Sequence, residues 1–431
     1  MTPPDTAGTE FAARVRSAAR SEDAPAGSAA GRSSLGDVCA VLWPPPATVS
    51  LLRGRPTRGR ERDLLVLPFA RRPRLLVPSG RRASAAAVRR YGEPGSLTAW
   101  AGTRALALAL AAGGARVGLG GRLRVSAGPG TGSAEPGTGT IEAYLRSVLG
   151  CEVLISTHLG AARANRKPVL QLLTPRGETA GFAKISVNPL TRDLIRAERA
   201  ALDTLAGEDF RELTMPRVLH HGQWQGREVL IMNALPVWRR RKALRPGQLV
   251  AAMTELTAVG GRSHGPLAGS DYLARLRSRL EASQAGPDRA ALGAALDTLA
   301  AAGAEFGFGA WHGDWTGWNM ASTADGLLVW DWERFALGVP AGFDFLHYRL
   351  QSDVVRRRRP PREAAAACVR DAPGCLAPFG VPAAEAPMVA ILYLAELSAR
   401  YLADRQAEAG ARLGQPGTWL IPTIEEAMRK L

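Results

Sequence analysis

The spacing of apolar residues changes near residue 236, where short runs typical of strands give way to stripes typical of helices. Before this point, residues 141–148 and 194–205 have helical spacing, and five apolar runs lie between polar turns. We expect these runs to form a small antiparallel sheet: residues 153–155, 169–172, 182–187, 218–219 and 229–232.

Beyond residue 236 apolar residues recur at helical spacing, which predicts a mostly helical region to the end of the chain. Pro246 stands where proline favours the first turn of a helix. The predicted helices are residues 246–256, 272–280, 292–299, 362–371 and 384–404. We therefore expect an α+β fold, with a sheet-containing N-lobe over residues 140–235 and a helical C-lobe over residues 236–431.

The first 139 residues differ in composition from the rest. Residues 1–34 are rich in Ala, Ser, Gly, Pro and charge without a sustained period, which predicts a disordered tail. Residues 35–139 are predicted to form an accessory basic α/β extension that ends in a Gly-rich linker at 118–139. Within the extension we expect a hairpin and two helices: residues 64–67 with 75–77, then 83–91 and 103–112.

The net charge of +16 is unevenly distributed, because residues 1–140 contain 20 Arg against 9 Asp and Glu. A basic region attracts nucleic acid or anionic lipid. This region, however, lacks the interleaved aromatic residues of a surface that binds single strands. We therefore expect no nucleic-acid partner.

Cysteine usage and the N-terminal sequence point to a cytoplasmic protein. The four Cys form no C-x-x-C pair, which suits reduced thiols rather than a disulfide frame or a zinc site. The N-terminus lacks a charged-then-apolar signal pattern. The apolar run near 105–112 is too short to cross a bilayer, so no membrane span is expected.

Candidate chemistry is concentrated in one stretch, W-H-G-D-W-T-G-W-N-M, followed by an apolar run that ends in D-W-E. Phosphoryl transfer needs a carboxylate to orient the attacking hydroxyl and oxygen ligands for magnesium. Asp314 and Asn319 can divide these tasks on one loop, and Asp331 adds a carboxylate at the end of a buried strand. Each residue alone fits a turn or a helix cap, but the three at this spacing predict phosphotransfer.

The pattern H-x-D-x4-N, followed by a strand and D-x-E, resembles the catalytic core of the aminoglycoside phosphotransferase and choline kinase-like family. This resemblance covers both lobes and implies a bilobal protein-kinase-like fold with ATP and Mg2+ as cofactors. It implies that Asp314 orients the acceptor hydroxyl, that Asn319 and Asp331 hold magnesium, and that His312 holds the loop by hydrogen bonds. Glu333 replaces the glycine of the protein-kinase D-F-G motif, and either a second metal contact or a salt bridge to an arginine is expected for it.

Lys184 is one of only four lysines and lies in an apolar strand, where its ammonium group must reach solvent or meet an anion. The resemblance implies that Lys184 contacts the nucleotide phosphates and pairs with Glu198 of the following helix. It also implies a phosphate-covering loop near Gly160, without the protein-kinase G-x-G-x-x-G, and adenine contacts through the backbone of Met232 to Ala234. The alternative for the first pair is an edge-strand lysine and a solvated glutamate.

Together these observations predict a phosphotransferase (small-molecule kinase) that transfers the γ-phosphate of ATP to a hydroxyl of a small molecule. One alternative is a protein kinase, which is disfavoured because no A-P-E-type activation segment follows Asp331. The other is a catalytically silent nucleotide-binding scaffold protein. The acceptor is expected to be neutral or anionic, since the helix at 386–402 offers only Glu396 as a carboxylate and Arg356 to Arg359 oppose a polycation. The sequence assigns neither the acceptor's identity nor the oligomeric state.

Overall fold

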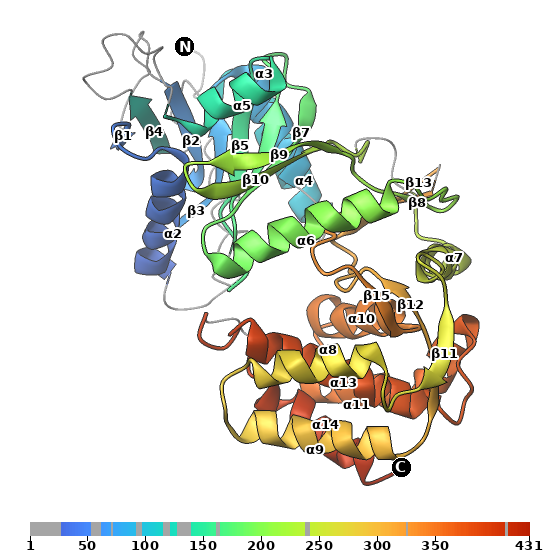
Figure 1. The fold of residues 1–431 in the computed structure, drawn as a ribbon. Coiled ribbons are helices and arrows are strands. Elements are labelled where there is room, and N and C mark those ends of the chain that lie inside the picture. The colour runs from blue at the N-terminus through green and yellow to red at the C-terminus, as the bar shows by residue number, and fades with distance from the viewer. Residues whose placement is uncertain are drawn as a thin grey trace, which may run out of the picture. The chain divides into compact units, whose positions relative to one another are not determined.

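The chain forms two compact units, each with its own apolar core (Figure 1). The sheet unit comprises Met1–Ala161, Pro168–Val187 and Gly222–Ala234, and the helical unit comprises Ala162–Lys167, Asn188–His221 and Leu235–Leu431. The structure is a computed structural model. It describes residues 27–52, 62–69, 72–91, 97–114, 121–126, 139–160, 164–237, 242–324, 326–409 and 413–431.

The sheet unit is built on one nine-stranded sheet with the order β1-β4-β2-β3-β5-β6-β7-β10-β9. The pairings from β1 through to β10 are antiparallel. The strands are β1 (Thr48–Leu52), β2 (Arg62–Phe69), β3 (Arg72–Pro78), β4 (Gly121–Ser126), β5 (Leu154–His158), β6 (Val169–Leu173), β7 (Thr179–Ile185), β9 (Val218–Trp224) and β10 (Arg227–Asn233).

Helices pack on both faces of this sheet because both faces are apolar. Side chains alternate between the faces of a strand, so Leu64 and Val66 join a core cluster with residues of α2 (Gly27–Leu42) and α5 (Ile141–Leu149). On the opposite face, Leu65 joins the cluster that contains residues of two further helices. Those helices are α3 (Arg81–Tyr91) and α4 (Leu97–Ala111).

The N-terminal region is part of this sheet. The predicted hairpin is confirmed as β2 and β3. Strand β3 also pairs with β5, with Leu75 opposite His158 and Leu76 opposite Thr157. The segment predicted as a Gly-rich linker contains β4, whose apolar Leu123 and Val125 are buried. Two apolar residues among polar ones are too few to predict a strand from the sequence. The strand forms because β4 pairs with β1 on one side and β2 on the other. The predicted disordered tail is helical from Gly27 onward, and residues 1–26 lie outside the described residues.

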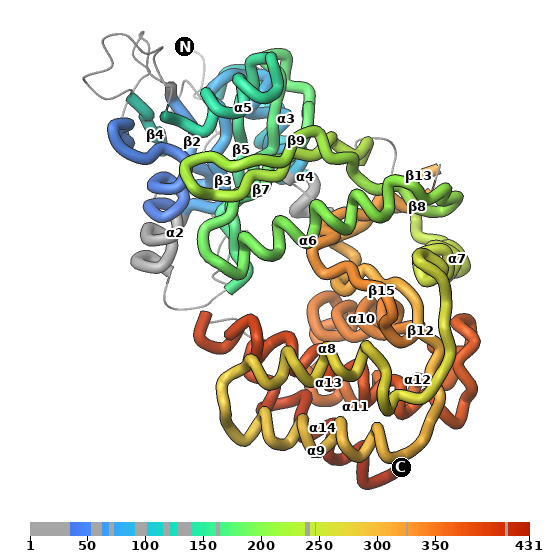
Figure 2. Tube along the Cα trace, viewed as in Figure 1, coloured from blue at the N-terminus to red at the C-terminus, as the bar shows by residue number. Residues whose placement is uncertain are grey.

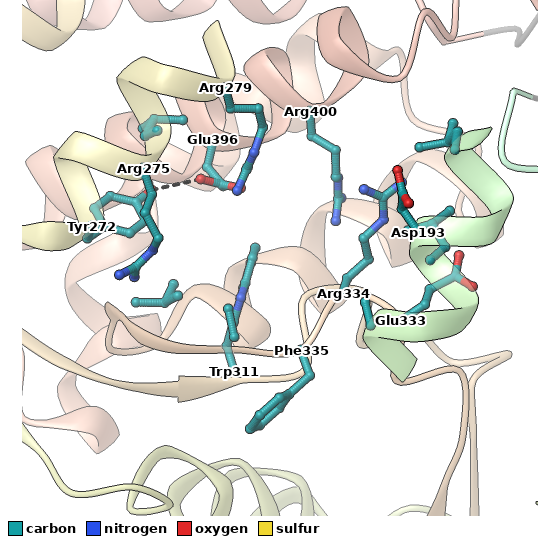
Figure 3. Close-up of a pocket in the computed structure, with 16 residues that line it drawn as sticks. Asp193, Tyr272, Arg275, Arg279, Trp311, Glu333, Arg334, Phe335, Glu396 and Arg400 are labelled. Carbon is teal, nitrogen blue, oxygen red and sulfur yellow. Dashed lines mark hydrogen bonds and ion pairs between the residues drawn. The ribbon is translucent and has the colours of Figure 1, made fainter. Parts of the chain in front are cut away.

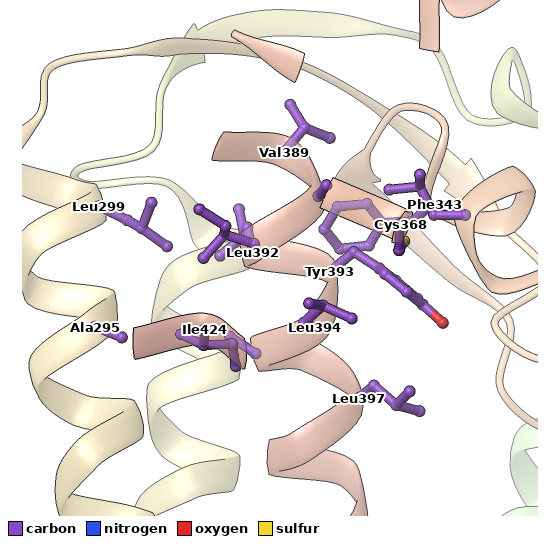
Figure 4. Packing of buried hydrophobic residues seen from close by; sticks show 14 of the residues in the cluster. Ala295, Leu299, Phe343, Cys368, Val389, Leu392, Tyr393, Leu394, Leu397 and Ile424 are labelled. Atoms are coloured by element: carbon purple, nitrogen blue, oxygen red, sulfur yellow. The ribbon is translucent and has the colours of Figure 1, made fainter. Parts of the chain in front are cut away.

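The helical unit is built around α13 (Ala386–Ala403), whose Leu392, Tyr393 and Leu394 lie in the core shown in Figure 4. Helices α8, α9, α11 and α14 contact one another or α13 (Figure 2). The other helices of this unit are α6 (Pro189–Leu205), α7 (Pro246–Thr257), α8 (Asp271–Glu281), α9 (Pro287–Ala301), α10 (Phe343–Gln351), α11 (Pro361–Arg370), α12 (Ala372–Leu376) and α14 (Leu420–Met428). The predicted α+β class, with antiparallel strands in one unit and mostly helices in the other, is confirmed.

Helix α6 groups with the helical unit, although the sequence placed it in the N-lobe. It begins with a capping box, in which the backbone N–H of Thr191 donates to Asn188 Oδ1 at 2.8 Å and the Thr191 hydroxyl accepts from the Asn188 N–H at 3.0 Å. Such a cap satisfies two backbone groups and fixes the first turn. Its apolar face carries Leu194, Ile195 and Leu202, and Glu198 is fully buried with them.

Two small sheets in the helical unit support the candidate site, and neither was predicted in full. One has the order β11-β12-β15, and the other the order β13-β14-β8. Their strands are β8 (Leu213–Thr214), β11 (Ser263–Pro266), β12 (Glu305–Trp311), β13 (Met320–Thr323), β14 (Gly326–Val329) and β15 (Ala336–Pro340).

Helix α13 is long and apolar enough, by length and composition alone, to cross a membrane. In the structure 72% of its residues are buried, among them the charged side chains of Glu396 and Arg400. The apolar character of α13 is therefore explained by its place in the protein core.

Candidate functional site

His312 lies directly after β12 and is fully buried against the indole rings of Trp315 and Trp332, whose centroids are 5.8 and 4.5 Å from its own. Its Nδ1 accepts a hydrogen bond from the backbone N–H of Asp314 at 3.1 Å, so the proton is on Nε2, which donates to the carbonyl oxygen of Trp330 at 3.1 Å. Burial lowers the pKa of His312 to about 4. The imidazole is neutral, and both of its nitrogens are engaged in hydrogen bonds to the backbone of Asp314 and Trp330.

Asp344, in the first turn of α10, holds the same loop from the other side. Its Oδ2 accepts from the backbone N–H of His312 at 2.7 Å, and its Oδ1 accepts from that of Gly313 at 3.0 Å. Burial raises the pKa of Asp344 to about 7, although the two N–H donors act in the opposite direction. Asp344 therefore holds the loop backbone through two hydrogen bonds.

Gly313 is the point where two further elements approach the loop. Its φ of 80° lies in the left-handed region, and a Cβ there would come within 2.4 Å of the carbonyl oxygen of Arg334. Arg400 of α13 donates through Nη1 to the Gly313 carbonyl at 2.5 Å. The glycine of the H-G-D motif is thus required by close backbone packing.

Asp314 has a side chain that is 34% exposed, while the groups that hold it are buried. Its Oδ1 accepts from His347 Nε2 at 3.1 Å, and its Oδ2 accepts from Asn319 Nδ2 at 2.9 Å. Burial acts to raise the pKa of Asp314, but the His347 hydrogen bond and the positive charge of Arg400 outweigh it and lower the pKa. Asp314 is therefore an ionised, oriented carboxylate that a bound molecule can reach.

His347 is a site residue that the sequence reasoning missed. It is 1% exposed, and its Nδ1 is 2.9 Å from the hydroxyl of Tyr393. Burial lowers the pKa of His347 and raises that of Tyr393, so the neutral tyrosine hydroxyl donates to Nδ1 and Nε2–H donates to Asp314. The sequence signal was its position one helical turn after Asp344, on the same face of α10.

Asn319 and Asp331 are brought together by the β13–β14 hairpin. Met320 pairs with Val329, and the backbone N–H of Trp330 donates to the carbonyl oxygen of Asn319 at 3.0 Å. The side-chain amide of Asn319 donates to Asp314, which leaves its Oδ1 as the atom for a metal ion. Asp331 has a φ of 74°, a conformation that costs about 1–3 kcal/mol in a non-glycine residue and recurs at functional sites.

Glu198 joins Asp331 and Glu333 in an acidic cluster, with carboxylate oxygens that all lie within 4.8 Å of one another. Glu198 also accepts from the backbone N–H of Trp332 at 3.3 Å. Glu333 forms a buried ion pair with Lys167. Carboxylate oxygens in such a group are the ligands that Mg2+ prefers, and Lys167 is a second residue that the sequence reasoning missed.

The predicted nucleotide contacts lie in the sheet unit. Lys184 of β7 is 6% exposed, and β7 pairs with β10 so that Leu230 is opposite Lys184 and Met232 is opposite Phe182. Gly160 and Ala234 are half-buried, and residues 161–163 of the predicted phosphate loop lie outside the described residues. The predicted ion pair between Lys184 and Glu198 would join the two units and stays a prediction.

A cavity of about 320 Å³ opens in the helical unit, lined in part by Trp311 and Glu333 (Figure 3). Its walls are formed by α6, α8, α13 and the segment at 333–336. Figure 3 shows Glu396 beside Arg279 on one wall and Arg400 directed from α13 toward the open centre. The cavity has the size of a site for a small organic molecule.

Comparisons with known proteins give low similarities. No protein-family model and no curated protein matches the sequence. The chain is similar to a candidate fructosamine-3-kinase from Thermobifida fusca at 18% identity, over 67% of this chain and 98% of that one, with a TM-score of 0.37. It is similar to a spectinomycin phosphotransferase solved with ADP and spectinomycin at 13% identity, over 66% and 93% of the two chains, with a TM-score of 0.38.

A third solved structure is an amicoumacin kinase bound to AMP-PNP and Ca2+, at 12% identity over 62% of this chain and 86% of that one, with a TM-score of 0.37. These structural neighbours are small-molecule kinases. At such identities and TM-scores they assign no activity to this chain.

Proposed function

We propose that this chain is an ATP- and Mg2+-dependent phosphotransferase that acts on a hydroxyl of a small molecule. The observation that carries the proposal is Asp314, a partly exposed carboxylate with a lowered pKa that two buried side chains orient. Such a group accepts a hydrogen bond from an alcohol, aligns its oxygen for attack and takes its proton late in the transfer.

The acidic cluster fits a magnesium ion by the chemistry of its donor atoms. Asp331, Glu333 and the Oδ1 of Asn319 are the ligands we propose, and Glu198 adds a third carboxylate close to the first two. When bound, magnesium neutralises the phosphate oxygens of the nucleotide. The clamped loop and the β13–β14 hairpin keep Asp314 and Asn319 at a fixed spacing, which divides acceptor and metal tasks between two ends of one loop.

The nucleotide would bind along β7 and β10. Lys184 is nearly buried in β7, where a lysine needs an anion close by, and phosphate oxygens would supply one. The backbone of Met232 to Ala234 would take the adenine, and Gly160 would lie near the phosphates. Glu198 has two candidate partners, Lys184 and the metal ion, and its place beside Asp331 supports the second.

The acceptor is proposed to be neutral or anionic, and the enzyme to act in the cytoplasm. The four cysteines are free thiols in the structure, which suits a reducing compartment. Arg275, Arg279, Arg334 and Arg400 line the cavity of the helical unit and disfavour a polycation.

Transfer of labelled phosphate from ATP to a panel of hydroxylated metabolites and antibiotics, with and without Mg2+, tests the proposal. We expect Mg2+-dependent labelling of at least one small molecule and none with Asp314→Asn. Labelling of added protein substrates alone would favour a protein kinase, and nucleotide binding without any transfer would favour a scaffold protein.

A further inference from the structure

The cavity of the helical unit carries an unusual concentration of arginine. Four guanidinium groups line it, from Arg275 and Arg279 of α8, Arg334, and Arg400 of α13. Its three carboxylates come from Asp193, Glu333 and Glu396. Whether such a wall attracts an anion depends on which of these charges already have partners.

Two of the four arginines have carboxylate partners. Arg279 forms an ion pair with Glu396, which also accepts from the hydroxyl of Tyr272, and Arg334 forms an ion pair with Asp404. Among the acids, Glu333 pairs with Lys167. These pairs balance each other and add no net charge to the wall.

Arg275 and Arg400 are different, because among the described residues they donate only to backbone carbonyls. Arg275 Nη2 donates to Leu337 and Gly338 oxygens at 2.9 and 3.0 Å, and Arg400 Nη1 donates to Gly313 at 2.5 Å. A carbonyl satisfies a donor but does not neutralise a guanidinium charge. Against these two cations the wall offers the exposed Asp193, and outside the wall the Asp314 carboxylate lies near enough to Arg400 for that charge to lower its pKa.

Arg400 should contribute more than Arg275 to binding an anion, because Arg400 is 8% exposed and directed into the cavity (Figure 3). A desolvated cation gains most from a charge-assisted, bidentate contact with an oxyanion. The same guanidinium touches the carbonyl next to Asp314, so an oxyanion bound to it lies beside the catalytic loop.

We propose that this cavity binds the acceptor, and that the acceptor is a small hydroxylated molecule carrying a carboxylate or phosphate group held by Arg400 and Arg275. That the bound molecule is the phosphate acceptor rests on the proposed phosphotransferase function. That the cavity binds an anion does not. It narrows the acceptor from neutral or anionic to anionic.

Binding of inorganic phosphate to the purified full-length chain, measured by calorimetry at low salt without nucleotide, tests the anion site. We expect Arg275→Gln and Arg400→Gln each to weaken phosphate binding by about tenfold or more, the loss of one charge-assisted contact. The matched control is Arg277→Gln, on the same helix but paired with Asp297 outside the cavity, which should bind as the parent chain does. Arg275 is exposed, so its variant decides the question even if Arg400→Gln fails to fold.

The site assignment is overturned if the parent chain binds no phosphate, or if Arg275→Gln and Arg400→Gln bind it as the parent does. It is equally overturned if Lys184→Met alone abolishes binding, because the phosphate then occupies the nucleotide site.

Matched acceptors separate this inference from the proposed function. Sorbitol and gluconate differ in one carboxylate, as do glucose and glucuronate. We expect kcat/KM to be higher for the anionic member of each pair, and we expect Arg275→Gln to abolish this preference. Equal use of both members, unaffected by Arg275→Gln, would reject the anionic acceptor and leave the phosphotransferase. Arginine-dependent phosphate binding without transfer to any acceptor would reject the phosphotransferase and leave the anion site.

Discussion

The loop at 312–319, which carries the proposed catalytic Asp314, and the acidic cluster of Glu198, Asp331 and Glu333 both contain carboxylates, but their charges have different surroundings. In the loop, the Asp314 carboxylate meets donors from His347 and Asn319, with the charge of Arg400 close by. In the cluster, three carboxylates lie with oxygens within 4.8 Å of one another, and Lys167 is the cation that pairs with one of them.

The difference lies in the balance of charge. Two like charges about 4 Å apart repel by about 1 kcal/mol in water and about 4 kcal/mol near a protein surface. A divalent cation bound among the three carboxylates would offset this repulsion. Hydrogen bonds from His347 and Asn319 hold the Asp314 carboxylate, whereas a metal ion is proposed to hold the carboxylates of the cluster. The two regions should therefore fail in different ways when they are changed.

The largest effect should follow Asp314→Asn. The amide cannot accept the hydroxyl proton, so we expect kcat to fall about 10²-fold or more while nucleotide binding stays nearly unchanged. Steady-state kinetics and calorimetry with an ATP analogue measure the two quantities. Full turnover in this variant would show that Asp314 has no catalytic role.

Asp331→Asn should fail in the opposite way, through the metal. We expect the apparent affinity for Mg2+ in the nucleotide complex to fall by about 10–100-fold. Because the change relieves repulsion, the melting temperature of the metal-free protein should not fall. Asn tolerates the left-handed backbone of Asp331, whereas Asp331→Ala should cost a further 1–2 kcal/mol, roughly, in unfolding free energy. If Mg2+ affinity is unchanged in both variants, the cluster is no metal site.

Lys184→Met tests whether the sheet unit supplies a cation that contacts the nucleotide phosphates. Methionine packs well in a strand, so we expect a folded protein with nucleotide affinity lowered by about tenfold, the loss of one charged contact. Circular dichroism and nucleotide titration measure both. If nucleotide affinity and activity are those of the parent, the predicted position of Lys184 in the N-lobe is wrong.

The smallest effect should come from His347→Phe, which removes the hydrogen bond but preserves an apolar ring. The hydrogen bond that orients Asp314 contributes about 1 kcal/mol, so its loss should lower kcat by about fivefold. Burial acts to raise the pKa of Asp314 and the His347 hydrogen bond helps to lower it. Without that bond the pKa rises, so the acid limb of the kcat profile should move to higher pH.

Tyr393→Phe is the matched change one step further from Asp314 and should give a weaker shift in the same direction. A His347→Phe variant with lower kcat but an unchanged pH profile would make His347 a packing residue only.

Much of the secondary structure and the central motif followed from the sequence because they depend on contacts between near neighbours. The apolar run before Asp331 predicts a strand after the H-G-D loop, and the hairpin that forms sets Asn319 beside Trp330 and Asp331. The helical stripes likewise gave α7, α8, α9, α11 and α13 close to their observed bounds. Within a segment, the period of the apolar residues is enough to fix the element and its buried face.

Only the tertiary structure decided which distant groups complete the site. Asp314 meets His347 from 33 residues away, Gly313 meets Arg400 from 87, Trp332 meets Glu198 from 134, and Glu333 meets Lys167 from 166. It also joined β1, β2, β3 and β4 to the strands of the predicted N-lobe in one sheet. A hydrophobic period shows which face of a segment is buried but not which segment packs against it. The polar partners of a buried charge are therefore chosen only when distant elements pack together.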